Sequence, residues 1–315
     1  MKLIIQIPCY NEAETLPITL ADLPKEVPGF DQVEWLVIND GSKDATEEVA
    51  REHGVDHIVS FSRNRGLAHG FMAGLDACVK LGADVIVNTD ADNQYNAQDI
   101  PLLVQPVLDK KADLVIGERP ISKIKHFPLI KKLLQKLGSW VVRVASRTDI
   151  PDAPSGFRAI SRDAALRLNV FNDYTYTLET IIQAGQKNMA VVSVPIRVNE
   201  DLRPSRLFKS IPSYIRKSSI IIVRIFVVYK PFRFFLSLAF IALLLGSLIG
   251  IRFLYFYFFT HDASGHIQSL ILASILLGMG FQAFALAFLA DLLAVNRRLM
   301  EDVQYRIRVR ESFKE

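Results

Sequence analysis

Three clusters of polar residues in the first hundred positions have the composition of a ligand-binding site. They are residues 10–12 (YNE), 40–42 (DGS) and 90–92 (DAD), and each follows a short aliphatic run. Two carboxylates as close as those of Asp90 and Asp92 repel each other unless a cation lies between them. A divalent metal that also binds a diphosphate would relieve this repulsion. We therefore expect Asp90, Asp92 and the nearby Gln94 to hold Mg²⁺ or Mn²⁺.

Each of these motifs also has a structural interpretation. The DAD sequence alone is compatible with a solvated turn whose aspartate caps a helix, and Asp-Gly is common turn chemistry. No GxGxxG follows a strand and no GxxxxGK[ST] is present, which disfavours dinucleotide oxidoreductases and P-loop kinases. Gly66, Gly70 and Gly74 recur every four residues. We expect them to pack a helix closely against a sheet rather than to bind phosphate.

The elements that would position these clusters alternate between strand and helix patterns. Predicted strands span residues 3–7, 33–38, 57–61, 84–88, 114–117 and 191–198, and predicted helices span 14–23, 45–53, 66–81 and 98–108. This alternation predicts an α/β fold with a doubly wound, mostly parallel sheet, in which ligands bind at the carboxyl ends of the strands. All three clusters fall at that edge, which favours the metal site. Asp44 and Glu47 are spaced as a capping pair for the second helix, and residues 128–147 suit a basic amphipathic helix.

Two later segments are long enough to cross a membrane. Residues 234–251 and 266–290 contain no Asp, Glu, Lys or Arg, and their lengths are those of transmembrane helices. Lys and Arg crowd the outer flanks of the pair, whereas the connection at 260–265 has none. The positive-inside rule then predicts a two-helix hairpin with both termini in the cytoplasm. We expect a multi-pass protein of the plasma (inner) membrane.

Composition supports a membrane protein and excludes several other classes. The 315 residues are 50% hydrophobic and 22% charged, with a net charge of +4. The surplus basic residues lie near the apolar segments, so we expect contact with membrane lipids and not with nucleic acid. Residues 211–229 are too charged to span and suit a helix at the membrane interface. Cys9 and Cys78 have no metal or disulfide spacing and are expected to be packed thiols.

The polar clusters belong to longer motifs whose order and spacing can be compared with known families. Residues 7–12 (IPCYNE), 37–42 (VINDGS), 64–66 (NRG) and 90–94 (DADNQ) resemble inverting family 2 glycosyltransferases of the GT-A fold. Residues 152–158 (DAPSGFR) are similar to the D-x-x-S-G-F-R stretch of dolichyl- and polyprenyl-phosphate sugar synthases. The resemblance covers roughly residues 3–210. It implies transfer of a sugar from a nucleotide-diphosphate donor, such as a UDP- or GDP-sugar, to a polyprenyl phosphate.

The resemblance also implies roles for the matching positions. The nucleotide-sugar would be bound by Pro8, Tyr10, Asn11, Glu12, Asp40 and Asp90, and the metal by Asp90, Asp92 and Gln94. The catalytic set would comprise Asp92, Arg119, Arg203 and Lys209, with Arg119 matching a family G-x-R. Further candidate site residues are Asp152, Ser155, Arg158 and Glu179. One departure is that residues 93–96 read NQYN where Leu-Gln-His-Pro is more usual.

The acceptor phosphate is expected to bind a basic loop. The family's R-x-x-G-x-S-K becomes RPSRLFK at residues 203–209, which keeps the outer Arg and Lys. A phosphate monoester is mostly a dianion at neutral pH, so it needs a cationic site more than a strong base. Arg203, Arg206 and Lys209 would supply that site. The alternative is simple attraction of these residues to anionic headgroups.

These expectations divide the chain into four regions. They are a cytoplasmic GT-A domain (1–208), an interfacial amphipathic segment (209–230), two transmembrane helices (231–291) and a basic cytoplasmic tail (292–315). Gly246 and Gly250 form a GxxxG face that could pack against the second span or against another subunit. The sequence therefore leaves a homo-oligomer open.

Competing functions can be weighed against the same sequence. A processive polysaccharide synthase would carry more spans and a Gln-x-x-Arg-Trp motif, and neither Trp35 nor Trp140 lies in one. A sugar nucleotidyltransferase would have no use for a membrane hairpin. Two alternatives stay open. One is a glycosyltransferase acting on another lipid or glycan acceptor in cell-envelope polysaccharide synthesis, and the other is a non-catalytic, membrane-anchored nucleotide-sugar binder.

Overall fold

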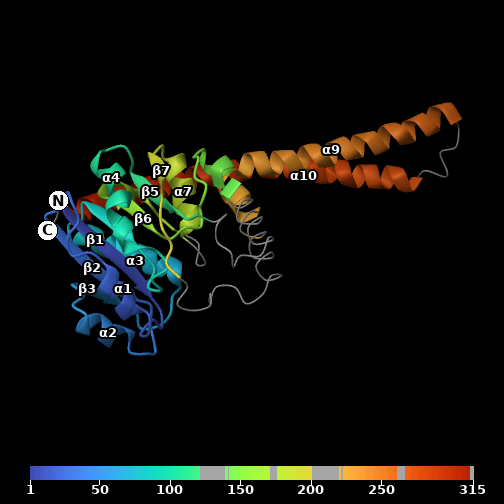
Figure 1. Ribbon diagram of the computed structural model, residues 1–315. Helices are drawn as coiled ribbons and strands as arrows, with labels where there is room; N and C mark the ends of the chain where they lie inside the picture. Colours follow the sequence, from blue (N-terminus) through green and yellow to red (C-terminus); the bar gives the residue numbers. More distant parts are fainter. Residues whose placement is uncertain are drawn as a thin grey trace. The chain divides into compact units, whose positions relative to one another are not determined.

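A computed structural model of the chain describes residues 1–120, 139–140, 142–170, 176–200, 220, 223–260 and 267–312. Its residues fall into two compact units. The first combines Met1–Ser219 with Glu301–Glu315, and the second is Ile220–Met300. Figure 1 shows the sheet in the first unit and the two long apolar helices in the second.

A seven-stranded sheet in the order β3-β2-β1-β4-β6-β5-β7 forms the centre of the first unit. The strands are β1 (Lys2–Cys9), β2 (Gln32–Asn39), β3 (His57–Ser60), β4 (Val85–Asn88), β5 (Leu114–Glu118), β6 (Arg158–Ser161) and β7 (Val191–Pro195). Every neighbouring pair is parallel except the two that include β6, which runs antiparallel to β4 and β5. The predicted α/β sheet is confirmed, and β6 is the strand that the prediction missed.

Helices cover both faces of this sheet, which makes it doubly wound (Figure 1). They are α1 (Leu16–Asp22), α2 (Thr46–Glu52), α3 (Leu67–Lys80), η1 (Ala97–Asp99), α4 (Ile100–Leu108), α6 (Arg162–Arg167) and α7 (Thr177–Gln186). On one face, Ile5 and Val87 join a buried cluster with α1 and α4. On the other face, a Cβ built on Gly74 of α3 would lie 2.8 Å from Ile38 Cδ1. The predicted close packing of this helix against the sheet is confirmed at Gly74.

The predicted capping pair at Asp44 and Glu47 is wrong. Helix α2 is preceded by Ala45, and no side chain caps it. Asp44 Oδ1 instead accepts from the backbone N–H of Thr46 at 3.2 Å, while Glu47 Oε2 accepts from Ser60 Oγ at 2.6 Å. Asp44 thus still contacts the first residue of α2, whereas Glu47 bonds Ser60 and Asn39 at the ends of β3 and β2, so the reciprocal pair does not form.

Other predicted features of this unit fall partly outside the described residues. Within the predicted helix 128–147, residues 139–140 and 142–146 are helical, and residues 121–138 and 141 are not among those described. Cys9 and Cys78 are buried free thiols, as predicted.

The second unit contains α9 (Pro231–Tyr255), a π-helical turn η3 (Phe256–Thr260) and most of α10 (Ile267–Ser312). Both helices are long and apolar enough to cross a membrane. A Cβ on Gly246 would lie 3.0 Å from Leu277 Cγ of α10, and one on Gly280 would lie 2.6 Å from Leu243 Cγ of α9. The GxxxG face therefore packs against the second helix of the same chain.

Helix α10 is longer than the predicted second span. It continues without a break to Ser312, and Glu301 onward belongs to the first unit. In the predicted interfacial segment, residues 220 and 223–229 are helical, and residues 209–219 and 221–222 lie outside the described part.

Candidate active site

The candidate site lies at one edge of the sheet because of the strand directions. Strands β1, β2, β4 and β5 run parallel, so their carboxyl ends meet at the same edge. Strand β6 is antiparallel and begins there, with Arg158 opposite Asn88 of β4. The missed strand thus brings residues 152–158 to the loop of Asp90 and Asp92.

Asp90 and Asp92 are partly accessible to solvent at this edge. Burial by the surrounding protein raises the pKa of Asp90 to about 7, and the carboxylate of Asp92 adds to the increase. Arg119 and Arg158 oppose it. The charge of Asp92 thus disfavours ionisation of Asp90, and a divalent cation would offset that repulsion.

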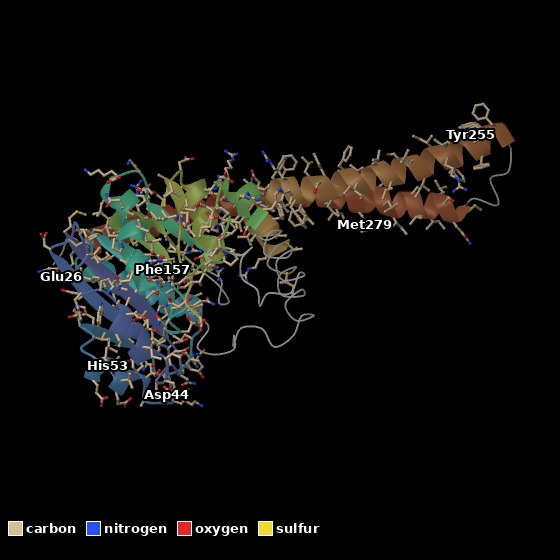
Figure 2. All side chains as sticks on the ribbon, viewed as in Figure 1. Glu26, Asp44, His53, Phe157, Tyr255 and Met279 are labelled. Atoms are coloured by element: carbon tan, nitrogen blue, oxygen red, sulfur yellow. The ribbon has the colours of Figure 1, made fainter. Side chains whose placement is uncertain are left out.

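The carboxyl of Asp90 rests on the backbone of Gly156. A Cβ at Gly156 would lie 2.9 Å from Asp90 Oδ2. The Gly156 N–H donates to the Tyr95 hydroxyl oxygen at 2.9 Å, and Asn88 Nδ2 donates to the Gly156 carbonyl at 2.8 Å. The neighbouring Phe157 is fully buried in the interior of the first unit (Figure 2). A side chain at position 156 would therefore displace Asp90.

Arg119 is held by Asp152 in a two-pronged ion pair. Arg119 Nε and Nη2 donate to Asp152 Oδ2 and Oδ1 at 2.7 and 2.9 Å. Both side chains are largely buried, with 10% and 1% exposed. Burial alone would lower the pKa of Arg119, but Tyr95, Asp152 and Asp90 outweigh it and raise that pKa. Arg119 therefore carries a fixed positive charge beside Asp90.

The other two predicted site residues of the DAPSGFR stretch, Ser155 and Arg158, are buried. Arg158 is fully buried and donates to the carbonyls of Ser155 and Ala153 at 2.8 and 2.9 Å, and also to Thr180 Oγ1. Burial lowers the pKa of Arg158 to about 10, which leaves it cationic at neutral pH. Ser155 Oγ is buried and has no hydrogen-bond partner among the described residues. These side chains shape the loop around Asp90.

Glu179 lies on α7, next to the helix residue Thr180 that Arg158 contacts. Its side chain is buried, with 8% of the residue exposed. The structure thus places it inside the first unit rather than on an exposed helix surface.

The predicted nucleotide-binding loops after β1 and β2 are bound to each other. The Asn11 N–H donates to Ser42 Oγ at 3.0 Å, and Asn11 Oδ1 accepts from the Lys43 N–H at 2.8 Å. The Glu12 N–H donates to Thr46 Oγ1 at 2.9 Å. Two of the three polar clusters therefore form one structural unit.

The other nucleotide-binding candidates differ in how freely they face solvent. Asp40 is buried, and its carboxylate accepts the N–H groups of Arg65 and Gly66 at 2.7 and 2.8 Å, which fixes the start of α3. Pro8 is half-buried, whereas Tyr10 is 39% exposed. Tyr10 thus offers an accessible ring at this edge.

One contact that the sequence did not predict joins the metal loop to the chain after β7. Asn199 donates its N–H to the Gln94 carbonyl and its Nδ2 to the Asn93 carbonyl, both at 2.9 Å. The buried Asp99 accepts from the backbone N–H of Arg197 at 2.6 Å and from its guanidinium. These partners lie about a hundred residues apart, and neither segment has a sequence pattern that pairs them. Arg203, Arg206 and Lys209, which follow, lie outside the described residues.

The carboxylates at this edge suit a divalent cation that is also bound by phosphate oxygens of a substrate. Among the described residues, no group of three or more His, Cys, Asp or Glu side chains is arranged to hold a metal. Mg²⁺ is commonly bound by one or two carboxylates together with phosphate oxygens. Asp90 and Asp92, with their mutual repulsion and the close-fitting Gly156 backbone, meet that requirement, and Gln94 lies in the same loop.

Comparison with known proteins gives consistent results. The family described as glycosyl transferase family 2 matches residues 4–168. The undecaprenyl-phosphate mannosyltransferase of Micrococcus luteus is 30% identical over 218 residues, which cover 66% of this chain and 88% of that protein. The polyprenol monophosphomannose synthase of Mycolicibacterium smegmatis is 29% identical over 210 residues, covering 63% and 78%.

A solved structure shows the same fold. Glucosyl-3-phosphoglycerate synthase from Mycobacterium tuberculosis, in complex with Mn²⁺, uridine diphosphate and phosphoglyceric acid, aligns with a TM-score of 0.55 and 19% identity. The alignment covers 72% of this chain and 77% of that one.

Proposed function

The chain belongs to glycosyltransferase family 2, and on that premise we propose that it transfers a sugar from a nucleotide-diphosphate donor to a polyprenyl phosphate. The observation that carries the proposal is the arrangement at the sheet edge, where Asp90 and Asp92 share the loop after β4, Asp90 lies against Gly156, and Arg119 is held in a buried ion pair with Asp152. The names of the relatives in M. luteus and M. smegmatis support the polyprenyl phosphate acceptor.

The residues of the site divide into three tasks. Asp90, Asp92 and Gln94 would hold Mg²⁺ or Mn²⁺, which when bound neutralises charge on the diphosphate. The linked loops of Asn11 and Ser42, with Pro8, Tyr10, Glu12 and Asp40, would bind the nucleoside. Arg119, held in place by Asp152, would stabilise the negative charge that develops on the leaving nucleoside diphosphate.

The acceptor phosphate needs little activation. Because its second pKa is about 6, it is mostly a dianion at neutral pH and attacks the anomeric carbon directly. A single displacement of this kind inverts the configuration. Arg203, Arg206 and Lys209 would bind the phosphate. The hydrogen bonds of Asn199 to the metal loop support Arg203 in this role, because the four-residue step from Asn199 to Arg203 spans at most about 14 Å.

We also propose that the enzyme is a plasma (inner) membrane protein with its catalytic domain and both termini in the cytoplasm. Helices α9 and α10 would form the hairpin, with 1–208 as catalytic domain, 209–230 at the interface, 231–291 in the membrane and 292–315 as a cytoplasmic tail. A cysteine introduced at Ser264 should react with an impermeant thiol reagent in intact cells, whereas one at Glu315 should not. The reverse labelling pattern would refute this orientation.

A transfer assay tests the function. Purified protein in micelles is supplied with undecaprenyl phosphate and a panel of radiolabelled UDP- and GDP-sugars, and labelled lipid is extracted. We expect one donor to be used in the presence of Mn²⁺, and Asp92→Asn to lower turnover by two or more orders of magnitude while the fold is kept. Donor binding without transfer to any acceptor would instead indicate a nucleotide-sugar binder. Transfer only to another lipid or glycan would refute the polyprenyl phosphate acceptor.

A further inference from the structure

The chain directly after β7 pairs with the loop that carries the predicted metal ligands. Val198 and Tyr95 form an antiparallel bridge. One position further on, the Asn199 N–H donates to the Gln94 carbonyl at 2.9 Å. The two segments therefore lie side by side, although about a hundred residues separate them in the chain.

The side chain of Asn199 adds two contacts to the same loop. Its Nδ2 donates to the Asn93 carbonyl at 2.9 Å and to the Tyr95 carbonyl at 3.5 Å. Together with the bond from its backbone N–H, this single residue binds three consecutive carbonyls, those of residues 93–95.

The shape of the loop makes these contacts important. Asn93 has a φ of 53°, in the left-handed region that residues other than glycine seldom adopt. Its Nδ2 donates to Asp22 Oδ2 of α1 at 2.7 Å, so its side chain and its carbonyl are held by two different elements. The next residue, Gln94, donates its N–H to Asp92 Oδ1 at 3.3 Å. The contacts of Asn199 thus reach the carboxylate of Asp92 through one residue.

An ion pair anchors the segment two residues before Asn199. The buried carboxylate of Asp99 accepts the backbone N–H and Nη2 of Arg197 at 2.6 Å each, and Arg197 Nε at 2.9 Å. Hydrogen bonds from a cation to a carboxylate are among the strong ones in proteins. This anchor therefore determines where Asn199 meets the loop.

We propose that Asn199 is a positioning residue that holds the loop of residues 90–94 in the form in which Asp92 and Gln94 bind the divalent cation. Gln94 is bonded at its carbonyl by Asn199 and at its N–H by Asp92, which fixes the peptide groups on both sides of its side chain. Partners that orient metal ligands affect metal affinity by roughly 10- to 100-fold. The inference rests on the proposed function, because it requires Asp92 and Gln94 to be ligands of the cation.

The test is the affinity for Mn²⁺ of the full-length protein in micelles, followed by the electron paramagnetic resonance signal of free Mn²⁺ with UDP or GDP present and with the nucleotide alone as the blank. Asn199→Ala removes both side-chain bonds and leaves the backbone bond to Gln94. We expect the Kd for Mn²⁺ to rise about tenfold. The KM for Mn²⁺ should rise with it, while kcat at saturating Mn²⁺ changes less than about threefold.

Asn199→Asp is a second variant, with a side chain of nearly the same size. Its carboxylate cannot donate to the carbonyls of Asn93 and Tyr95. The added negative charge beside the loop would by itself attract Mn²⁺. We expect the Kd for Mn²⁺ to rise in this variant as well, which a purely electrostatic effect cannot produce.

Asn96→Ala is the matched control, because Asn96 is an asparagine of the same paired segment. Its Oδ1 accepts from the Gln98 N–H at 3.0 Å and caps η1, while its own N–H donates to the Arg197 carbonyl at 3.4 Å. Loss of this cap should lower the melting temperature about as much as Asn199→Ala does, with little change in the Kd for Mn²⁺.

Three results would overturn the inference. If either Asn199 variant binds Mn²⁺ as tightly as the wild type, Asn199 does not position the cation ligands, and the proposed function stands. If Asn96→Ala loses as much affinity as Asn199→Ala, the side-chain bonds of this segment have only a structural role. If the wild type binds no Mn²⁺ with either nucleotide, the metal site of the proposed function fails, and the inference fails with it.

Discussion

Gly156 is a residue at which one added methyl group would test the proposed metal site. The atom nearest to an added Cβ is the carboxyl oxygen of Asp90, at 2.9 Å. Since a carboxyl at the end of a side chain moves more easily than backbone, the fold can accommodate an alanine by rotating Asp90 away. The cost would then fall on cation binding and not on folding.

We therefore predict that Gly156→Ala lowers sugar transfer at least tenfold, equivalent to about 1.4 kcal/mol, while the melting temperature changes little. Gly70→Ala is the control, because its nearest neighbours would lie at ordinary distances of 3.8 and 3.9 Å. That variant should keep full activity. Transfer rates and thermal unfolding of both variants in micelles provide the measurement, and an active Gly156→Ala enzyme would contradict the assignment of Asp90.

The two cysteines lead to a pH prediction. Burial raises the pKa of the Cys9 and Cys78 thiols well above the ordinary value, and the nearby Glu12 raises that of Cys9 further. Because the thiolate is the reactive form, neither should be alkylated by iodoacetamide between pH 7 and 10 in the folded protein. Both should react once guanidinium unfolds it, as mass spectrometry would show.

The same shifts link stability to pH. Folding raises the pKa of both thiols above the value of about 8.5 that a cysteine has in the unfolded chain. Below about pH 8.5 the thiols are protonated in both states, so the stability that their burial contributes is complete there. Above that value the free energy of unfolding should fall by about 1.4 kcal/mol per pH unit for each thiol. Rapid alkylation of either cysteine at pH 8 in the native protein would show that it is accessible.

At the scale of residues, the sequence identified candidate site residues but not the side chains that they contact. Asp90 and Asp92 were singled out because two carboxylates at a strand end are chemically unusual, and their role as metal ligands stays a prediction. The ion pair of Arg119 with Asp152 joins residues 33 positions apart. No local pattern encodes such a pair, so it became visible only once the strand order was known.

At the scale of elements, the strands with continuous apolar runs were predicted to within a few residues. Strand β6 has four residues, RAIS, and begins with a charged arginine. Its pattern is too short to distinguish it from a loop, and only pairing with β4 and β5 stabilises it as a strand. The length of α10 was underestimated because the prediction ended the helix where its apolar run ends.

The packing of α9 against α10 gives a prediction at the same scale. A Cβ at Gly280 would lie 2.6 Å from Leu243 Cγ and 3.1 Å from the Leu243 backbone nitrogen, whereas one at Gly278 would meet nothing within 4 Å. Gly280→Ala should therefore destabilise the helix pair by roughly 1–3 kcal/mol through overpacking, and Gly278→Ala should be nearly neutral. Thermal unfolding in micelles can compare them. Equal stability would mean that the two helices are not packed through Gly280.

At the scale of the whole molecule, the first unit includes the C-terminal end of α10, from Glu301 onward. Glu301 pairs with Lys187 at 3.1 Å, Tyr305 donates its hydroxyl to Asp163 at 3.1 Å, and Arg308 Nη1 donates to the Leu168 carbonyl at 2.8 Å. These three residues recur at helical spacing, so one face of α10 contacts the first unit. The sequence predicted only a basic tail here, because each contact requires a partner more than a hundred residues away.

We predict that Tyr305→Ala destabilises the protein by about 1–2 kcal/mol, through loss of its hydrogen bond and of the contact between its ring and the Arg167 guanidinium. For a unit of this size, that is a fall of several degrees in the melting temperature. Arg306→Ala is the control, because Arg306 is exposed and pairs with Asp302 on its own helix, so it should change stability by less than about 0.5 kcal/mol. Equal melting temperatures would show that the end of α10 does not stabilise the first unit.

The position of Glu301–Ser312 in the chain also orders events during synthesis. The ribosome makes all seven strands before α9 and α10, and the residues that complete the first unit are made last, as the C-terminal end of α10. A nascent chain that ends before Glu301 therefore contains all seven strands but lacks the contacts that Glu301, Tyr305 and Arg308 make with the first unit. Full stability of the first unit would then be reached only once the C-terminal end of α10 has been made.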